Sequence, residues 1–545
     1  MIVPADHQPE LAVDRLIVDD DPGDDATPLD VLFVGAGPAG LAGAIRLAQL
    51  VGEDPDVGEV EIGVLEKAES LGEHSLSGAV VDPRAFYRLF PTLIEDELPF
   101  LGPVQGERVY WLTESGQIPV PAPPDMRNHG HHVASICEIV RWLGERAEGL
   151  GVNLFTGFPA EALLVEGRRV RGVRTTAGGL DRNGQPGSGY LPPNSLTAKV
   201  TVLSDGTRSA LAQAYLRWQE IGSENPQIYA LGVKELWETK RPLDSVIHTL
   251  GWPLPRDAFG GSWLYPMGPN LVSLGLVVGL DYAQHTLDVH ALTQTLKQHP
   301  LFRKALEGGE MVEWGAKTIP EGGFYSVPQR LHGDGLLIVG DAAGLVNVAA
   351  LKGIHHAMHS GILAAEAIFQ ALKSGDASAK TLASYDRSLR GSFVFEDLRR
   401  TRNMRLAFKS GFYLGGLKAS MMSLTRGAFP GGRISTEEDA AEPRRSVPAA
   451  EFRPDGKYTF SKVDAVFRSG NKTRDDIPVH LTIGSDIPSE VAEFYEHLCP
   501  AGVYERDGNG LVVNAPNCID CKATDVLGPR WNPREGGCGP AYKRM

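Results

Sequence analysis

The stretch that most constrains the fold is residues 30–40, which read DVLFVGAGPAG. The apolar run VLFV is typical of a strand that is buried on both faces. It leads directly into a G-x-G-x-x-G turn, from Gly35 to Gly40, and then into a segment of helical composition. In such a turn the first glycine permits a tight bend, the second lets a pyrophosphate approach the backbone, and the third lets helix pack on strand. The turn therefore predicts a doubly wound α/β domain that binds a dinucleotide.

Three later strands end in acids that suit the same ligand. Residues 61–66, EIGVLE, end in Glu66, which can hydrogen-bond ribose hydroxyls. The usual spacing from the glycine turn to such an acid is ~20 residues. The spacing is longer in this chain because of a polar insert at 52–59. Residues 198–206 end in Asp205, and residues 335–344 carry Asp341 before a predicted helix from about Ile354. The segments that suit a dinucleotide are spread from residue 35 to residue 353. FAD therefore fits better than NAD, because an NAD site needs only the first strand–turn–helix unit.

Composition narrows the class of protein. The net charge of −15 argues against nucleic acid as a partner, and no run of 18 apolar residues predicts a spanning helix. Residues 1–28 are acidic, without the features of a signal or transit peptide, so we expect a disordered lead-in and a cytoplasmic product.

The remaining chain divides by pattern. Residues 221–330 alternate like a sheet and predict a largely β domain inserted into the nucleotide domain. Residues 408–424 predict a helix, which on composition either lies in a membrane surface or packs on the nucleotide domain. Residues 427–448 are rich in glycine, proline and charge, which is typical of a linker.

Four of the five cysteines lie in the last tenth of the chain: Cys499, Cys518, Cys521 and Cys538. Such clustering in a reducing compartment indicates a metal or cluster site. Cys518 and Cys521 form a C-x-x-C pair, and Cys499 precedes a proline, as in ferredoxin-like sites. Zinc uses the same ligands, but a flavin in the same chain favours an iron–sulfur cluster, since only a cluster passes electrons on.

From about residue 30 onward the chain contains, in this order, the motifs GAGPAG, HSLSGAVVDP, HTLGWPL, GGSWLY, LKG, CPAGVYE, NCIDCK and EGGCGPAY. In these motifs the chain resembles the electron transfer flavoprotein–ubiquinone oxidoreductase family. The resemblance implies one FAD, one [4Fe-4S] cluster and electron transfer from reduced electron transfer flavoprotein to ubiquinone or menaquinone. It also implies peripheral attachment, through the helix at 408–424, to the cytoplasmic face of a bacterial inner membrane. No nucleophile or general base is required, so none is nominated.

The implied fold is α/β plus α+β: a two-domain, Rossmann-like FAD-binding fold of the glutathione-reductase/hydroxylase type. The FAD domain spans 29–220 and 331–426, the β-rich quinone-binding domain 221–330, and the ferredoxin-like iron–sulfur domain 449–545. Gly260 and Gly261 are implied to lie at the quinone head group, and Tyr504 near the cluster. The predicted FAD contacts are Val34, Gly35, Gly37, Pro38, Ala39, Gly40, Glu66, Lys67, Ser77, Gly78, Asp205, Gly206, Asp341, Gly344, Asn347 and Gly353.

One position departs from the family pattern. A third loop cysteine is expected where Thr524 stands, while Cys538 interrupts the glycine run near the end. We predict that Cys499, Cys518, Cys521 and Cys538 are the ligands; the alternatives are a [3Fe-4S] or oxygen-ligated cluster, or none. Two other functions stay open: a FAD-dependent reductase or hydroxylase of an isoprenoid or aromatic substrate, and a flavoprotein binding partner without a cluster.

Overall fold

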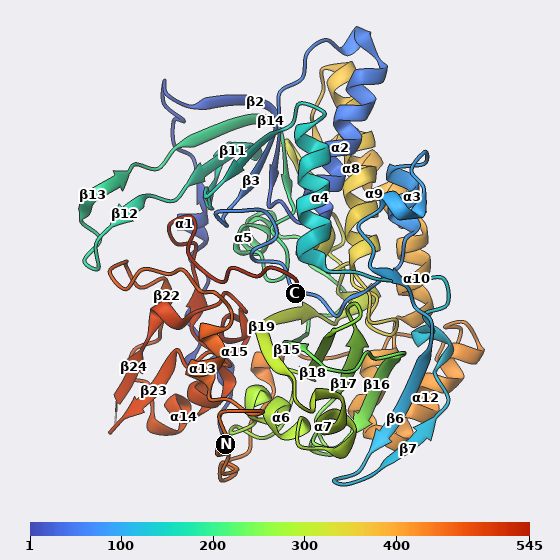
Figure 1. The fold of residues 1–545 in the computed structure, drawn as a ribbon. Helices are drawn as coiled ribbons and strands as arrows, with labels where there is room; N and C mark the ends of the chain where they lie inside the picture. Colours follow the sequence, from blue (N-terminus) through green and yellow to red (C-terminus); the bar gives the residue numbers. More distant parts are fainter. Residues whose placement is uncertain (509) are drawn as a thin grey trace.

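The computed structural model describes residues 1–508 and 510–545 and arranges them around two large sheets (Figure 1). The upper sheet in the view belongs to the nucleotide-binding part, and the lower sheet to the β-rich region. Residues 449–545, in orange and red, lie beside the lower sheet and share its hydrophobic core.

The upper sheet is the doubly wound sheet that the glycine turn predicts. β2 pairs in parallel with β3 on one side and β14 on the other, and β9 and β21 continue the parallel region. The end of β2 is buried on both faces, which explains why its sequence is apolar without alternation. Its strands, among the described residues, are β1 (Ile17–Val18), β2 (Thr27–Val34), β3 (Ile62–Glu66), β9 (Asn153–Thr156), β10 (Ala160–Glu166), β11 (Arg169–Thr175), β14 (Ser195–Leu203), β20 (His332–Gly333) and β21 (Leu336–Ile338).

Three long helices, α2 (Pro38–Glu53), α4 (Ile136–Glu148) and α8 (Ile354–Ser374), pack side by side against this sheet (Figure 1). α8 crosses α2 closely, because a Cβ at Gly361 would lie only 2.0 Å from the Ala39 carbonyl oxygen. The other helices of this part are α1 (Val13–Leu16), α3 (Arg84–Leu89), α5 (Ala210–Trp218), α9 (Ala379–Arg390), α10 (Phe393–Thr401) and α11 (Met404–Ala407).

The lower sheet runs in the order β19-β15-β18-β17-β16-β6-β7. Its last two strands, β6 (Glu107–Leu112) and β7 (Gln117–Val120), come from before the predicted insertion at 221–330, so the sheet is larger than the sequence indicates. The others are β15 (Tyr229–Glu238), β16 (Val246–Gly251), β17 (Gly260–Pro266), β18 (Leu271–Gly279) and β19 (Glu310–Pro320), with α6 (Val289–Leu296) and α7 (Pro300–Leu306) beside them.

The C-terminal part is built from short elements around the cysteines. After α12 (Phe412–Leu424) it contains α13 (Lys462–Phe467), β22 (Leu481–Thr482), α14 (Ser489–Leu498), β23 (Tyr504–Asp507), β24 (Gly510–Val513), α15 (Ala523–Leu527) and β25 (Arg530–Trp531). Small sheets elsewhere are formed by β4 (Val80–Val81), β5 (Gly102–Pro103) and β8 (His132–Val133), and by β12 (Gly178–Leu180) and β13 (Pro186–Leu191).

Two segments differ from the sequence prediction. The prediction of disorder over residues 1–28 is wrong: β1 pairs with β10, Ile2 and Leu16 are buried, and the Gln8 side chain donates to the Asp525 carbonyl. The predicted linker at 427–448 connects the expected parts but is anchored, because the buried Arg444 guanidinium donates to the carbonyls of Leu280 and Asp439. Composition alone does not reveal this anchoring, because it depends on one arginine that donates to backbone carbonyls.

Candidate functional site

The glycine turn has room for a ligand at one of its three glycines. A Cβ at Gly35, where φ is +105°, would lie 2.7 Å from the Ser204 carbonyl oxygen, and one at Gly40 would lie 2.2 Å from the Gly35 carbonyl oxygen. Around Gly37, by contrast, no heavy atom lies within 4 Å of the Cβ position. The first and third glycines thus serve the packing of strand, loop and helix, and the second leaves open space at the start of α2, as a pyrophosphate requires.

Glu66 ends β3 beside this turn, as predicted. Its Oε2 accepts from the Ala36 amide at 3.1 Å and its Oε1 from the Ala68 amide at 2.9 Å. The carboxylate therefore fixes the turn and keeps free lone pairs for a ligand.

Buried polar atoms without partners indicate where a ligand fits. Within the described part of the chain, Ser77 Oγ, Asp205 Oδ1 and both ring nitrogens of His74 have no hydrogen-bond partner. Such atoms cost about 1–3 kcal/mol each when left unsatisfied. The sequence predicts Ser77 and Asp205, whereas His74 was missed; its only signal is its position in the same loop. These groups fit a cofactor rich in hydroxyl and phosphate groups such as FAD.

The second FAD segment closes into a compact loop before α8. Asp341 Oδ2 accepts from the Thr207 hydroxyl at 3.3 Å, and burial raises the pKa of Asp341. The backbones of Asn347 and Lys352 exchange two hydrogen bonds, which brings Gly353, at the start of α8, near Asp341. The other predicted contacts lie at this edge of the sheet or in its turns: Val34 ends β2, Pro38 and Ala39 open α2, Gly206 and Gly344 have φ of +79° and +75°, and Gly78 lies in the loop before β4.

Three of the four candidate cluster ligands converge on one aromatic residue. Cys499 follows α14, and Cys518 and Cys521 lie on the loop before α15; all three are buried. Burial, and then these three thiols, raise the pKa of Tyr504 well above its usual range. The neighbouring Thr524 hydroxyl opposes this shift and lowers the Tyr504 pKa. The structure thus groups Cys499, Cys518 and Cys521 around Tyr504, with Thr524 adjacent.

Cys538 makes a different contact. Its Sγ donates to Glu535 Oε1 at 3.6 Å, and Arg534 and Glu535 are the main charges around it. The tail that carries it crosses the nucleotide-binding part, where the Gly537 amide donates to the Lys67 carbonyl at 2.9 Å.

Asp520, between the C-x-x-C cysteines, connects the loop of the candidate cluster ligands to the predicted FAD loop. Its Oδ2 lies 2.5 Å from Lys67 Nζ, and its Oδ1 accepts from Arg534 Nη2 at 2.9 Å. Although burial alone would raise its pKa, Arg534 and Lys67 hold the pKa of Asp520 well below the usual range. The atoms of His480, Cys518 and Asp520 lie close enough for a metal, but these two cations already neutralise the carboxylate.

A strand of the lower sheet also contacts the loop of the candidate cluster ligands. The Thr318 amide of β19 donates to the Cys521 carbonyl at 3.0 Å, and Lys317 Nζ donates to the Asp520 carbonyl at 3.3 Å. Burial, and then Lys67 and Lys522, lower the pKa of Lys317 to about 8. Lys317 also lowers the pKa of Asp341, against the effect of burial, so Lys67, Lys317 and Lys522 form a wall of lysines between the predicted flavin and cluster residues.

Gly260 and Gly261 begin β17 and are half-buried. A Cβ at Gly260 would lie 2.1 Å from the Val277 carbonyl oxygen, and one at Gly261 would lie 3.0 Å from the Thr249 carbonyl oxygen. Close packing of β17 on β18 therefore requires glycine at position 260, whether or not a ligand binds beside it.

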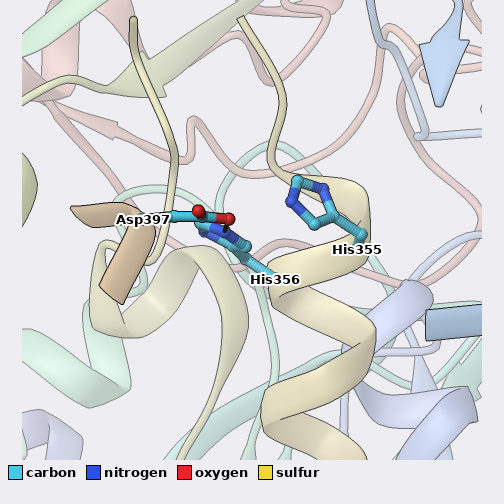
Figure 2. A group of neighbouring side chains, drawn as sticks. All are labelled: His355, His356 and Asp397. Carbon is cyan, nitrogen blue, oxygen red and sulfur yellow. Dashed lines mark hydrogen bonds and ion pairs between the residues drawn. The ribbon is translucent and has the colours of Figure 1, made fainter. Parts of the chain in front are cut away.

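Sequence reasoning missed a histidine cluster at the start of α8, shown in Figure 2. His356 Nε2 lies 3.4 Å from Asp397 Oδ2, and the rings of His355 and His356 are 4.2 Å apart. The Arg84 guanidinium donates to Asp397 and to Asp82, at 2.9 Å each. Because this cation already pairs with both carboxylates, the cluster does not suit a metal ion.

Solved structures share this architecture. A geranylgeranyl bacteriochlorophyll reductase-like protein from Thermoplasma acidophilum matches with a TM-score of 0.55 at 20% identity, covering 73% of this chain and 90% of that one. A myxobacterial FAD-dependent chondrochloren halogenase matches with a TM-score of 0.52 at 20% identity, covering 72% and 86%. These likenesses show a fold that FAD-dependent enzymes also have, to which this chain adds a C-terminal domain with four cysteines.

Sequence comparison then gives the family. Residues 229–319 match a family model described as ETF-QO, ubiquinone-binding, and residues 456–543 match one described as electron transfer flavoprotein-ubiquinone oxidoreductase, 4Fe-4S. The mitochondrial electron transfer flavoprotein-ubiquinone oxidoreductase of Caenorhabditis elegans is 38% identical to this chain, over 95% of this chain and 92% of its own length. The protein of the same name from Homo sapiens is 39% identical, over 95% of this chain and 90% of its own length. The chain belongs to the electron transfer flavoprotein–ubiquinone oxidoreductase family.

Proposed function

We propose that this chain takes electrons from reduced electron transfer flavoprotein and passes them, through a [4Fe-4S] cluster and FAD, to ubiquinone. The observation that carries the proposal is similarity along 95% of the chain to enzymes of this name, including both the quinone and the cluster regions. The alternative of a reductase or hydroxylase rests on fold likeness alone.

The residues that would hold FAD are those predicted at the strand ends. Gly37 and the start of α2 would accept the pyrophosphate, Glu66 the ribose, and Ser77, Asp205 and Asp341 the remaining hydroxyl and ring groups. When bound, FAD accepts electrons singly and delivers them in pairs. Lys67, Lys317 and Lys522 place positive charge at the wall between the sites, which favours the reduced, more negative states on both sides.

We propose that the quinone binds in the lower sheet near Gly260 and Gly261, in a domain of residues 221–330 enlarged by β6 and β7. The match of residues 229–319 to a ubiquinone-binding family model supports this placement. In the seven-stranded sheet, Gly261 shares a face with Trp263 and Tyr265 by strand alternation.

The functional test uses the purified protein, chemically reduced electron transfer flavoprotein and short-chain ubiquinone. We expect quinone reduction that requires the flavoprotein, flavin absorbance bands, and an EPR signal from a reduced cluster. Oxidation of NADH or NADPH without quinone would instead support the reductase alternative. Flavin bands with no iron or acid-labile sulfide would support the binding partner without a cluster.

We propose that Cys499, Cys518 and Cys521 hold three irons, and that Cys538 or Thr524 completes the site. For Cys538 to bind, its thiol must leave Glu535; Thr524 lies next to Tyr504 and offers an oxygen. Iron and sulfide content and EPR spectra of Cys538→Ala and Thr524→Ala distinguish the two residues. If Cys538 is the ligand, only Cys538→Ala loses an iron; the reverse result selects Thr524. A full, spectrally unchanged cluster in both variants excludes both.

We propose peripheral attachment through α12, at the cytoplasmic face of a bacterial inner membrane. Four apolar side chains of α12 point outward, with exposed fractions of 50% for Leu414, 60% for Leu417, 40% for Met421 and 84% for Leu424. Their spacing places them along one face of the helix, while Met422 packs inward. Across the described residues no helix is long and apolar enough to span a bilayer.

A further inference from the structure

Reduction of a quinone consumes protons as well as electrons: Q + 2 e⁻ + 2 H⁺ → QH₂. Under the proposed function, two molecules of reduced electron transfer flavoprotein supply the two electrons through this chain, and water outside supplies the protons. Both large sheets are well packed, so the protons need a path of polar groups from the surface to the face of the lower sheet.

A polar pocket of about 400 Å³ opens among residues 82–84, 124–131, 347–355 and 397–400. Its lining includes Asp82, His131, Lys352 and His355, together with the exposed Arg127 and His129 at its rim. His131 Nε2 lies 3.6 Å from Asp82 Oδ2. Solvent therefore reaches a group of proton-exchanging side chains directly in front of Lys352.

A chain of hydrogen bonds leads inward from Lys352. Its Nζ donates to Asn128 Oδ1 at 2.6 Å, and Asn128 Nδ2 lies 3.5 Å from His248 Nε2. His248 Nδ1 in turn lies 3.1 Å from the Tyr265 hydroxyl oxygen. All four side chains are buried, and they come from three parts of the chain that the fold brings together.

Asn128 is held in the orientation that this chain needs. Its side-chain nitrogen also donates to Glu107 Oε2 at 3.2 Å, and its backbone amide donates to the same oxygen at 2.8 Å. The amide oxygen therefore faces Lys352 and the amide nitrogen faces His248. An amide does not itself relay protons, so Asn128 only positions the ammonium and the imidazole at its two ends. For a transfer, its 3.5 Å contact with His248 Nε2 opens, and a water molecule carries the proton from Lys352 to that nitrogen; the contact then re-forms.

The polarity of the remaining bonds follows from this orientation. Because Nε2 of His248 accepts from Asn128, its proton lies on Nδ1, which donates to Tyr265; the Tyr265 hydroxyl is then free to donate onward. Tyr265 lies on the face of β17 that also carries Gly261. Its ring lies 3.8 Å from the Cβ position of Gly78, in the proposed FAD loop.

We propose that Lys352, Asn128, His248 and Tyr265 conduct protons from the pocket at Asp82 and His131 to the face of the lower sheet where quinone is reduced. Lys352 is the donor, His248 and Tyr265 transfer the proton, and Asn128 is a positioning residue. The lysine is reprotonated from the pocket. Each quinone reduced draws two protons through this route.

The electrostatics of the buried groups agree with these roles. Burial lowers the pKa of Lys352 to about 8, with Asp82 and Glu107 opposing the shift, so this ammonium can release and regain a proton near neutrality. Burial, and then Lys352, lower the pKa of His248 to about 3, which keeps the ring neutral. The titratable groups that face Lys352 are Asp82, Glu107, His131, His248 and His355.

The test compares Lys352→Arg with Lys352→Met in the FAD- and cluster-loaded enzyme. Arginine keeps the charge but does not release its proton at neutral pH, so we expect both variants to slow quinone reduction by about 100-fold or more. Proton uptake, followed by a pH-indicator dye during a single turnover with short-chain ubiquinone, should slow in parallel. The rate of quinone reduction by the wild type should fall as the pH rises through about 8, where Lys352 loses its proton. The rates of both variants should not show this decrease.

Ferrocenium, which accepts one electron and no proton, provides the control acceptor. Its reduction should stay within about twofold of wild type in every variant, since loss of the relay leaves electron transfer intact. Tyr265→Phe, which removes only a hydroxyl, should slow quinone reduction and leave ferrocenium reduction unchanged; the surface variant Lys199→Met should change neither. Flavin content and ubiquinone affinity, measured alongside, exclude damage to the binding sites.

Quinone reduction at the wild-type rate in Lys352→Arg, or in both Lys352→Met and Tyr265→Phe, would overturn the relay. A wild-type enzyme that reduces ferrocenium with electron transfer flavoprotein but never reduces quinone would instead overturn the proposed function.

Discussion

The glycine turn allows a prediction that separates ligand binding from folding. Gly37→Ala and Gly40→Ala add the same methyl group at two positions three residues apart. At Gly40 the new Cβ would lie 2.2 Å from a backbone oxygen, which the sheet cannot move, so we expect a loss of about 2–3 kcal/mol in the free energy of unfolding. At Gly37, where φ is −78° and ψ is −179°, the Cβ contacts nothing within 4 Å. The unfolding free energy of the apoprotein should there stay unchanged or rise by about 0.4–1 kcal/mol.

FAD affinity should respond in Gly37→Ala even though stability does not. If the pyrophosphate lies over Gly37, the methyl group enters its space; a clash of about 2 kcal/mol corresponds to roughly a 30-fold rise in Kd. Thermal unfolding of the flavin-free proteins and FAD titration by flavin fluorescence measure the two effects. Wild-type FAD affinity in Gly37→Ala would refute the placement of the pyrophosphate, and an unchanged unfolding midpoint in Gly40→Ala would refute the packing argument.

Three other predictions concern helix α12, which we propose attaches the protein to a membrane, and two buried charges. Leu417→Glu should reduce sedimentation with anionic phospholipid vesicles, because it puts a charge on the apolar face of α12; Leu191→Glu, at an exposed leucine of β13, is the matched control, and equal binding by both variants would contradict the role of that face. Lys297→Met should cost about 3–5 kcal/mol in chemical unfolding, because it removes the cation that lies 2.8 Å from the fully buried Glu235 carboxylate and leaves that charge uncompensated; recovery in the double variant with Glu235→Gln checks this cause. Burial, and then Asp281, raise the pKa of Asp439 from 3.8 to about 8, so its contribution to stability is present below pH ~4 and lost as pH rises through about 8. The unfolding temperature of Asp439→Asn relative to wild type should therefore increase between pH 5 and 9, and a constant difference would contradict the shift.

The parts that the sequence predicted well depend on local signals. The apolar run before Gly35 and the glycines after it specify strand, turn and helix within one short stretch, and the structure confirms each. Ser77 and Asp205 were predicted from their loops, and both carry the unpartnered buried atoms that a cofactor needs.

What the sequence did not show depends on contacts between distant segments. Nothing near Asn128 indicates that its amide separates Lys352 from His248, since the three are brought together only by the packing of both sheets. Similarly, the contact of Cys538 with Glu535 depends on where the tail crosses the nucleotide-binding part. The order of residues 1–28 was missed because a few apolar side chains, among them Ile2 and Leu16, secure a segment that is otherwise acidic.

The early origin of β6 and β7 has a consequence for synthesis on the ribosome. β6 ends at Leu112, but its parallel partner β16 begins only at Val246, so at 5–20 residues per second the hairpin waits roughly 7–27 s for it. During that time the edge of β6 presents unpaired amide and carbonyl groups to other nascent chains. We therefore expect chaperone demand to concentrate on this hairpin, and expect the quinone-binding sheet not to fold when it is expressed as residues 221–330 alone.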